Sequence, residues 1–311
     1  MFKKQNIGRI FSVLFLIYLL FYLSANKTLA EPLLAIPVIY IIVICSLKFV
    51  EIFINGLFTK LILREFGKKI GNKESFYISL LSTIGNYFGP ILGGAGIRAV
   101  YLKNKYKFNY SDFIGSLYGY YIISFLIISI LGLISSLNLS GSITNSLSIF
   151  YSGILLFTLF LIFIRLPEKI IDNKASVLSV LYGKILLIQN GWIKIKQSKL
   201  LIINFILLGV TISFLGIIGT YLQFKSLGLA INIPAIVIYS TLSSLSILIS
   251  ITPGAIGVRE AIFILVSSQL FLKTDDILQL SAIDRGATII VLVLLYLVSQ
   301  VVIFKRRINN N

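Results

Sequence analysis

The sequence has no histidine and only one cysteine, one tryptophan and one methionine. Without histidine, the side chain most often used for metal binding and for proton transfer near neutral pH is missing. The lone Cys45 lies inside an apolar run, so no disulfide can form within the chain, and a small core residue is the simplest interpretation. We therefore expect no metal site and no cofactor.

Acidic and polar residues are scarce as well. Eleven Asp and Glu stand against 28 Lys and Arg in 311 residues, whereas hydrophobic residues make up 57% and the mean hydropathy is +0.97. Several apolar runs reach the roughly 20 residues that a helix needs to cross a bilayer core of about 30 Å. The sequence predicts an all-α, multi-pass protein of the cell membrane. Because the basic residues are scattered between spans, the net charge of +17 indicates cytoplasmic loops and not nucleic-acid binding.

Breaks in the apolar pattern divide the chain into eight hydrophobic elements. They are Ile10–Ser24, Leu33–Asn55, Phe76–Tyr101, Phe113–Leu137, Leu147–Ile164, Leu200–Gln223, Ile233–Leu272 and Leu278–Phe304. The third is interrupted by Asn86, Pro90 and several glycines, and the seventh by Pro253 and Gly254. We expect these two to be broken, re-entrant hairpins, which leaves six full spans with both termini in the cytoplasm.

The positions of Lys and Arg support this topology. If neither broken element crosses, 22 of the 28 basic residues lie in cytoplasmic segments. If the third element crossed, Lys103, Lys105 and Lys107 would face outside, against the positive-inside rule. Irregular backbone is tolerated at membrane depth only inside protein or along a wet cavity, so Gly85–Tyr106 is a candidate cavity wall. The first element also looks like a signal peptide, although Thr28 fits a cleavage site poorly.

The two broken elements share a motif. Gly96-Ile97-Arg98 follows Pro90, and Gly257-Val258-Arg259 follows Pro253. Each half of the chain then has the order span, span, broken hairpin, span, which predicts one domain over 1–311 with inverted-topology halves at about 1–140 and 141–311. Inverted repeats with broken helices are a common plan for transporters, with the binding site at the interface of the repeats. A chance match of the triplet is the alternative in a chain with 23 glycines.

Charged side chains inside the apolar elements are the strongest functional candidates. A charge at mid-membrane costs at least about 2.5 to 3.5 kcal/mol, and such residues usually face a cavity or a charged partner. A guanidinium binds phosphate in a bidentate manner, which suggests an anionic lipid head group. The expected substrate-binding residues are Asn86, Pro90, Gly94, Gly96, Arg98, Pro253, Gly254, Gly257, Arg259, Glu260, Asp284 and Arg285. Lys48 and Glu51, three residues apart on one helix face, are interpreted as a structural pair.

The stretch between Pro167 and Lys199 is basic and only moderately apolar. It is too interrupted for a span, and we interpret it as an interfacial helix on the cytoplasmic face, with Trp192 at the depth of the head groups. An ordinary polar loop is the alternative.

The two motifs resemble those of the transmembrane region of lysylphosphatidylglycerol synthase, a flippase-like family. The matching residues are Asn86, Pro90, Gly94, Arg98 and Leu102 in the first motif, Pro253, Gly254, Gly257, Val258 and Glu260 in the second, and Arg285 before the last span. The resemblance covers roughly Ile10–Phe304. It departs at Ala95, where the family often has an acidic residue, and at Ala255 and Ile256, where Gly and Leu are usual.

The resemblance implies an integral membrane protein that moves an anionic, aminoacylated or glycosylated polar lipid, either a phospholipid or a polyprenyl-type lipid. In larger relatives this region precedes a soluble aminoacyl- or glycosyl-transferring domain, and none is expected here after the last span. Two alternatives remain open: an enzyme of lipid aminoacyl or glycosyl transfer, which would depend on the carboxylates Glu51, Glu260 and Asp284, or a membrane subunit of a separate lipid-modifying enzyme.

Overall fold

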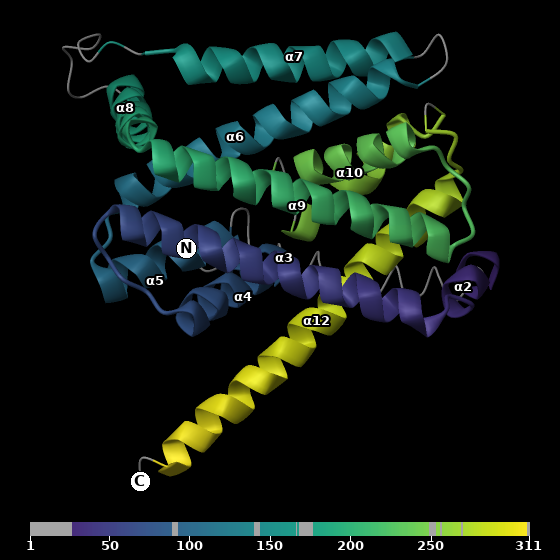
Figure 1. The fold of residues 1–311 in the computed structure, drawn as a ribbon, viewed down its shortest axis with the longest axis horizontal. Helices are drawn as coiled ribbons and strands as arrows, with labels where there is room; N and C mark the ends of the chain where they lie inside the picture. The colour runs from purple at the N-terminus through teal and green to yellow at the C-terminus, as the bar shows by residue number, and fades with distance from the viewer. Residues whose placement is uncertain are drawn as a thin grey trace.

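The computed structural model describes residues 27–88, 93–139, 144–165, 167, 177–248, 253–255, 257–268 and 270–309. All regular structure in these ranges is helical, and no strand occurs in them (Figure 1). The expectation of an all-α membrane protein is confirmed to this extent. The expected first element, Ile10–Ser24, lies outside the described residues.

Five helices in the described ranges are long and apolar enough to cross a membrane. They are α3 (Val38–Glu65), α6 (Tyr110–Leu137), α7 (Thr144–Phe163), α9 (Lys199–Ser226) and α12 (Thr274–Asn309). They correspond to the expected second, fourth, fifth, sixth and eighth elements. Large apolar side chains cover their outer faces, among them Ile149 and Phe163, as expected of surfaces that face lipid.

Both interrupted elements are broken, as expected. The third element is α4 (Asn72–Phe88) followed by α5 (Gly93–Tyr106), and the seventh is α10 (Ile233–Leu248), the short 3-10 helix η1 (Pro253–Ala255) and α11 (Val258–Leu265). α4 and α5 run antiparallel, because Gly94 N donates to Asn86 Oδ1 (3.0 Å) near the break and Tyr101 Oη donates to Glu74 Oε1 (2.8 Å) at the far end. The first broken element is therefore a helical hairpin.

The structure gives α3 and α9 the same length and the same ending. After α3, Gly67 has a φ of +71° and Lys68 N donates to Leu63 O (2.8 Å); after α9, Gly228 has a φ of +70° and Leu229 N donates to Phe224 O (3.0 Å). A glycine with positive φ directly after a helix satisfies the last carbonyl groups and stops the helix. Adding 161 to the bounds of α3 (38 and 65) gives those of α9 (199 and 226).

The same displacement relates the broken elements. Adding 161 to Asn72, the first residue of α4, gives Ile233, the first residue of α10, and adding it to Arg98 gives Arg259. The packing follows this order. α3 packs against α4 and α12, while α9 packs against α10 and α6, and α3 and α9 pack against each other, lying side by side near the centre (Figure 1).

The connecting segments follow the same pattern. α2 (Lys27–Leu34) precedes α3 and contacts α12, whereas α8 (Val177–Gln197) precedes α9 and contacts α6. The expected helix between Pro167 and Lys199 is thus present. Its backbone lies directly on α6, because a Cβ on Gly191 would be 2.6 Å from the Cα of Gly115. Trp192 is buried against Gly119 of α6, and its depth relative to lipid stays a prediction.

Candidate functional site

A tight turn at the end of the second broken element places charged residues against α12. Gly254 and Gly257 have φ values of +61° and +82°, which glycine adopts at little cost. Glu260 closes the turn, because Gly257 N donates to its Oε2 (2.8 Å). The side chains of Arg259 and Glu260, in the first turn of α11, therefore leave the turn next to the middle of α12.

Two ion pairs connect α11 to α12. Arg259 Nη1 is 2.5 Å from Asp284 Oδ2, and Arg285 Nη2 is 2.6 Å from Glu260 Oε1. All four side chains are buried. Two neighbours on one helix thus pair with two neighbours on the other, with the order of charges reversed. The structure brings together all four charged residues that the sequence analysis selected in the second half.

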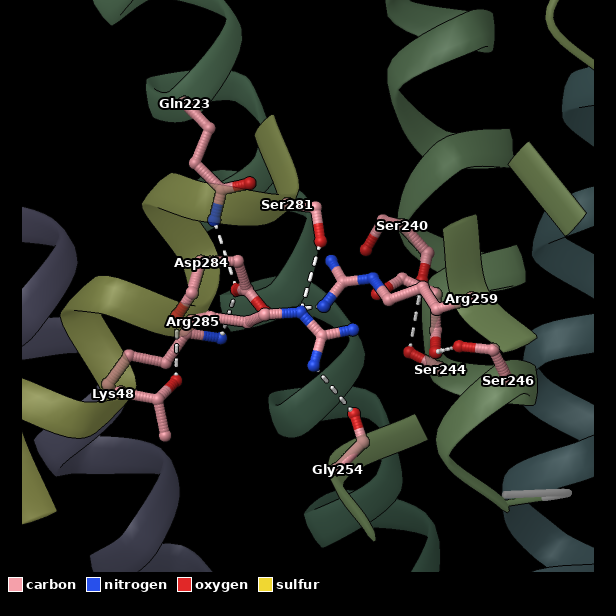
Figure 2. A network of polar contacts seen from close by, with 12 residues as sticks. Lys48, Gln223, Ser240, Ser244, Ser246, Gly254, Arg259, Ser281, Asp284 and Arg285 are labelled. Atoms are coloured by element: carbon pink, nitrogen blue, oxygen red, sulfur yellow. Dashed lines mark hydrogen bonds and ion pairs between the residues drawn. The ribbon is translucent and has the colours of Figure 1, made fainter. Parts of the chain in front are cut away.

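Asp284 also joins this site to two further helices. Its Oδ1 lies 2.8 Å from Lys48 Nζ of α3 and accepts from Gln223 Nε2 of α9 at 3.1 Å (Figure 2). Lys48 does pair with Glu51, as interpreted from the sequence, but at the longer distance of 3.3 Å. The lysine is therefore a member of the site as well as of a structural pair.

Arg285 holds the turn itself. Its Nε donates to Ser281 Oγ (3.1 Å) and its Nη1 donates to the carbonyl oxygen of Gly254 (3.2 Å), as Figure 2 shows. Ser281 Oγ in turn donates to Glu260. Because the guanidinium bonds both backbone and carboxylate in the turn, it fixes η1 and α11 relative to α12.

The charges of this network balance. Lys48, Arg259 and Arg285 carry three positive charges, and Glu51, Glu260 and Asp284 carry three negative charges. Burying ions is expensive in the apolar part of a membrane, and mutual pairing offsets much of that expense. We call these six residues the ion network. With all six groups ionised, the ion network has no net charge.

The tip of the first broken element reaches the same place. A Cβ added to Gly254 would lie 3.5 Å from Cδ1 of Tyr87 and 3.7 Å from Nη1 of Arg285. Tyr87, near the end of α4, also interacts electrostatically with Asp284 and Lys48. α4 packs against both η1 and α12. The two broken elements therefore meet at the ion network.

Arg98, the third guanidinium selected from the sequence, has other neighbours. It is buried, its Cζ lies 5.6 Å from the centre of the Phe58 ring, and Tyr120 and Tyr121 of α6 are its electrostatic neighbours. None of the ion pairs between described residues includes it. The structure thus places Arg98 in contact with α3 and α6 and not in the ion network.

The remaining selected residues form the backbone around the first break. Asn86 accepts from Gly94 N, and Ser82 Oγ donates to Gly94 O (2.8 Å). A Cβ on Gly94 would overlap Ser82 O and Asn86 Oδ1, so this close crossing requires glycine. Gly96 is exposed, with open space where a Cβ would be. Pro253 opens η1, and Pro90 lies outside the described residues.

Sequence reasoning missed four members of this site: Tyr87, Gln223, Ser281 and, as a functional residue, Lys48. A lysine in the middle of an apolar helix was a usable indication, because such a charge needs a partner. No comparable indication exists for Tyr87 and Ser281, since Tyr and Ser are common in helices of this kind. Gln223 had been assigned to the end of a span, where a polar residue is expected.

A family model described as "Lysylphosphatidylglycerol synthase TM region" matches residues 7–295 of the chain. A comparison with curated proteins found no significant match. The family match covers nearly all of the described helices, both broken elements and the complete ion network. The chain therefore belongs to the family of the lysylphosphatidylglycerol synthase transmembrane region.

Proposed function

We propose that the protein is a translocator of a polar lipid in the cell membrane, and that the head group passes where the two broken elements meet. The observation that carries the proposal is the ion network. Three cations and three anions lie in apolar helices, and residues of both halves contribute to them. Ionisable residues at membrane depth are expensive and are characteristic of substrate pathways.

The internal repetition supports this mechanism. The bounds of α3 and α9 and the starts of α4 and α10 are related by one displacement, and the contacts between helices repeat with them. The charge distribution favours opposite orientations of the two halves, since basic residues cluster after α3 and are sparse after α9. Rocking of one half against the other would then expose the central site to each side in turn.

Polar groups around the breaks could solvate a head group along its path. α10 carries Ser240, Ser244 and Ser246, and Figure 2 draws them in the same polar network as Arg259. Asn86 is exposed at the first break, and a Cβ on Gly96 of α5 would meet open space. The first amide groups of α5 and α11 add donors, because the N–H groups of a helical first turn have no partner within the helix. These groups would accept an anionic, aminoacylated or glycosylated head group.

The family description names a synthase, so catalysis of lipid modification is the natural competitor. In this chain, Glu260 and Asp284 are each bound by an arginine and by further donors. A carboxylate held in this way is a poor acid or base, because its oxygens are already occupied by donors. This arrangement favours binding and positioning over proton transfer.

The test is lipid transfer by the purified protein in vesicles. Phosphatidylglycerol or phosphatidylethanolamine carrying a fluorophore on an acyl chain is placed in both leaflets, and the fraction that an impermeant quencher reaches is followed over time. We expect faster exchange between leaflets than in protein-free vesicles. Lys225→Met, a change at the exposed end of α9, should match the wild type. No acceleration for any head group, including lysylphosphatidylglycerol, by folded protein would refute the proposal.

A further inference from the structure

Arg98 and Arg259 occupy equivalent positions in the two broken elements. Each is the third residue of a Gly-aliphatic-Arg triplet, each lies near the start of the second helix of its element, and 161 residues separate them. Both side chains are buried, and each guanidinium lies over a phenylalanine ring, at 5.6 Å for Arg98 and 5.7 Å for Arg259. The charged neighbours of the two arginines can therefore be compared directly.

Their counter-charges differ. Arg259 pairs with Asp284, and the position 161 residues before Asp284 is Ile123, a buried apolar residue of α6. Glu260, next to Arg259, corresponds to Ala99. The first half thus keeps the arginine and lacks both carboxylates that accompany it in the second half.

No described residue replaces these carboxylates at Arg98. Its neighbours are the ring of Phe58 and the tyrosines Tyr120 and Tyr121, and its Nε is buried without a hydrogen-bond acceptor in the described part of the chain. A buried cation without an anion is unfavourable, by more than most single interactions in a protein contribute. A ring face and tyrosine dipoles offset only part of this, so the guanidinium is poised to take an anion.

We propose that Arg98 is an anion subsite that binds a phosphate group, separate from the ion network. The guanidinium fork matches two phosphate oxygens, and the hydroxyl groups of the neighbouring tyrosines could donate to a third. Near the end of the same helix, Lys103 is half-buried and Lys105 is exposed and paired with Glu74. Lys103 would raise the local concentration of anions there. This phosphate is either part of a lipid head group or free phosphate. The lipid source rests on the proposed function.

Neutral substitution separates a ligand site from a structural arginine. Arg98→Met removes a charge that has no described counter-ion, so the melting temperature of the ligand-free protein in detergent should stay equal or rise. Arg259→Met, at the equivalent position, leaves Asp284 without its arginine partner and should lower the melting temperature. Equal losses in both variants would overturn the proposal, because Arg98 would then be as structurally engaged as Arg259.

Ligand binding gives the second readout. Melting is recorded with sodium phosphate against sodium chloride at matched ionic strength, and with dihexanoyl phosphatidylglycerol against dihexanoylglycerol. We expect stabilisation of the wild type by the phosphate-bearing member of at least one pair, loss of that shift in Arg98→Met, and a reduced shift in Arg98→Lys. A shift with the lipid alone assigns the site to head groups, and a shift with both assigns it to phosphate in general.

Identical shifts in the wild type and Arg98→Met, or no shift with either phosphate compound, would refute the subsite. The vesicle assay keeps the two proposals apart. If Arg98→Met loses the phosphate shift although the wild type moves no lipid, the subsite stands and translocation fails. If Arg98→Met moves lipid at the wild-type rate, translocation stands and Arg98 is not the head-group site.

Discussion

Lys48 of α3 and Asp284 of α12 lie 2.8 Å apart, 236 positions away from each other in the sequence. Asp284 is also 2.5 Å from Arg259, so one buried carboxylate holds a helix of the first half, the turn of the second broken element and α12 together. Any movement of the second broken element relative to α3 must rearrange the bonds of this aspartate. Asp284 therefore supports the site electrostatically from two sides, and the proposed rocking motion would have to break one of its contacts.

Asp284→Asn tests this central position. The amide keeps the shape but loses the charge, which leaves Lys48 and Arg259 without their closest counter-ion. Removing one member of a buried ion network costs about 3 to 5 kcal/mol. We expect a clearly lower melting temperature in detergent. Asp275→Asn, at an exposed position in the first turn of the same helix, is the control and should change it little. A melting temperature equal to the control would contradict the assignment.

Glu51→Gln should be much milder. Lys48 is closer to Asp284 than to Glu51, and the Glu51 side chain keeps 23% of its surface exposed. Solvent thus partly screens the Lys48–Glu51 pair, and Lys48 keeps its closer partner Asp284 when Glu51 is neutralised. We expect a loss of stability well below that of Asp284→Asn in the same melting experiment. A similar loss in both variants would mean that Glu51 is the dominant counter-ion of Lys48.

Composition and charge distribution predicted the helical membrane fold and the two breaks, because long apolar runs and interrupting prolines and glycines have local causes. They also predicted that Arg259, Glu260, Asp284 and Arg285 would matter, since charges in apolar helices need a reason. Whether Arg98 joins Arg259 and Arg285 could not be derived in this way, and the structure places Arg98 apart from them, against Phe58. Whether two distant side chains meet depends on the packing of α3, α6 and α12, which local patterns do not encode.

The residues that sequence reasoning missed depend on helix packing in the same way. Tyr87 and Ser281 belong to the site only because α4 and α12 both pass η1. The constant displacement of 161 residues was available in the sequence, but the shared identities are sparse enough for chance to compete. The matching geometry of the helix ends at Gly67 and Gly228 supports that displacement.

Gly115→Ala should detach α8 from α6. A new methyl group there would lie within collision distance of the Gly191 backbone, and two helix backbones cannot easily move apart by that amount without opening the contact. We expect a lower melting temperature and faster proteolysis between α7 and α9. Gly183→Ala, on α8 with nothing within 4 Å of the new methyl group, is the control and should leave stability equal or slightly higher. Equal behaviour of both variants would argue against close backbone packing.

Glu74 gives a prediction on pH at the base of the first hairpin. Burial by itself would raise the pKa of Glu74, and hydrogen bonds from Lys105, Tyr101 and Tyr106 lower that pKa below its usual value of 4.5. A carboxyl group whose pKa is depressed by folding contributes stability above the unfolded pKa and loses it as the pH falls through the folded pKa. Glu74→Gln should therefore melt at a lower temperature than the wild type at neutral pH and converge with it as the pH falls through the lowered pKa of Glu74.

The measurement for this prediction is the melting temperature between neutral and acidic pH. Glu65→Gln, at an exposed carboxylate near the end of α3, serves as the control. Its melting temperature should change with pH in parallel with that of the wild type. A constant difference between Glu74→Gln and the wild type down to the lowest pH would show that the effect is not electrostatic.

The re-entrant course of the first broken element has a direct test in cysteine labelling. Glu74 Oε1 lies 2.8 Å from Lys105 Nζ, so the start of α4 and the end of α5 are neighbours and must lie on the same side of the membrane. In a Cys45→Ser background, we expect Lys69→Cys and Asn104→Cys to react with an impermeant maleimide from the cytoplasmic side. Ala230→Cys, after α9, should react from the outside.

The positions are matched in exposure, since Lys69, Asn104 and Ala230 are all exposed. Labelling of Asn104→Cys from the outside would mean that the element crosses the membrane, and the two halves could not then be related by inversion. Labelling of all three from the cytoplasmic side would instead place the end of α9 in the cytoplasm. In that case α3 and α9 would no longer have opposite orientations, and the rocking mechanism would lose its structural basis.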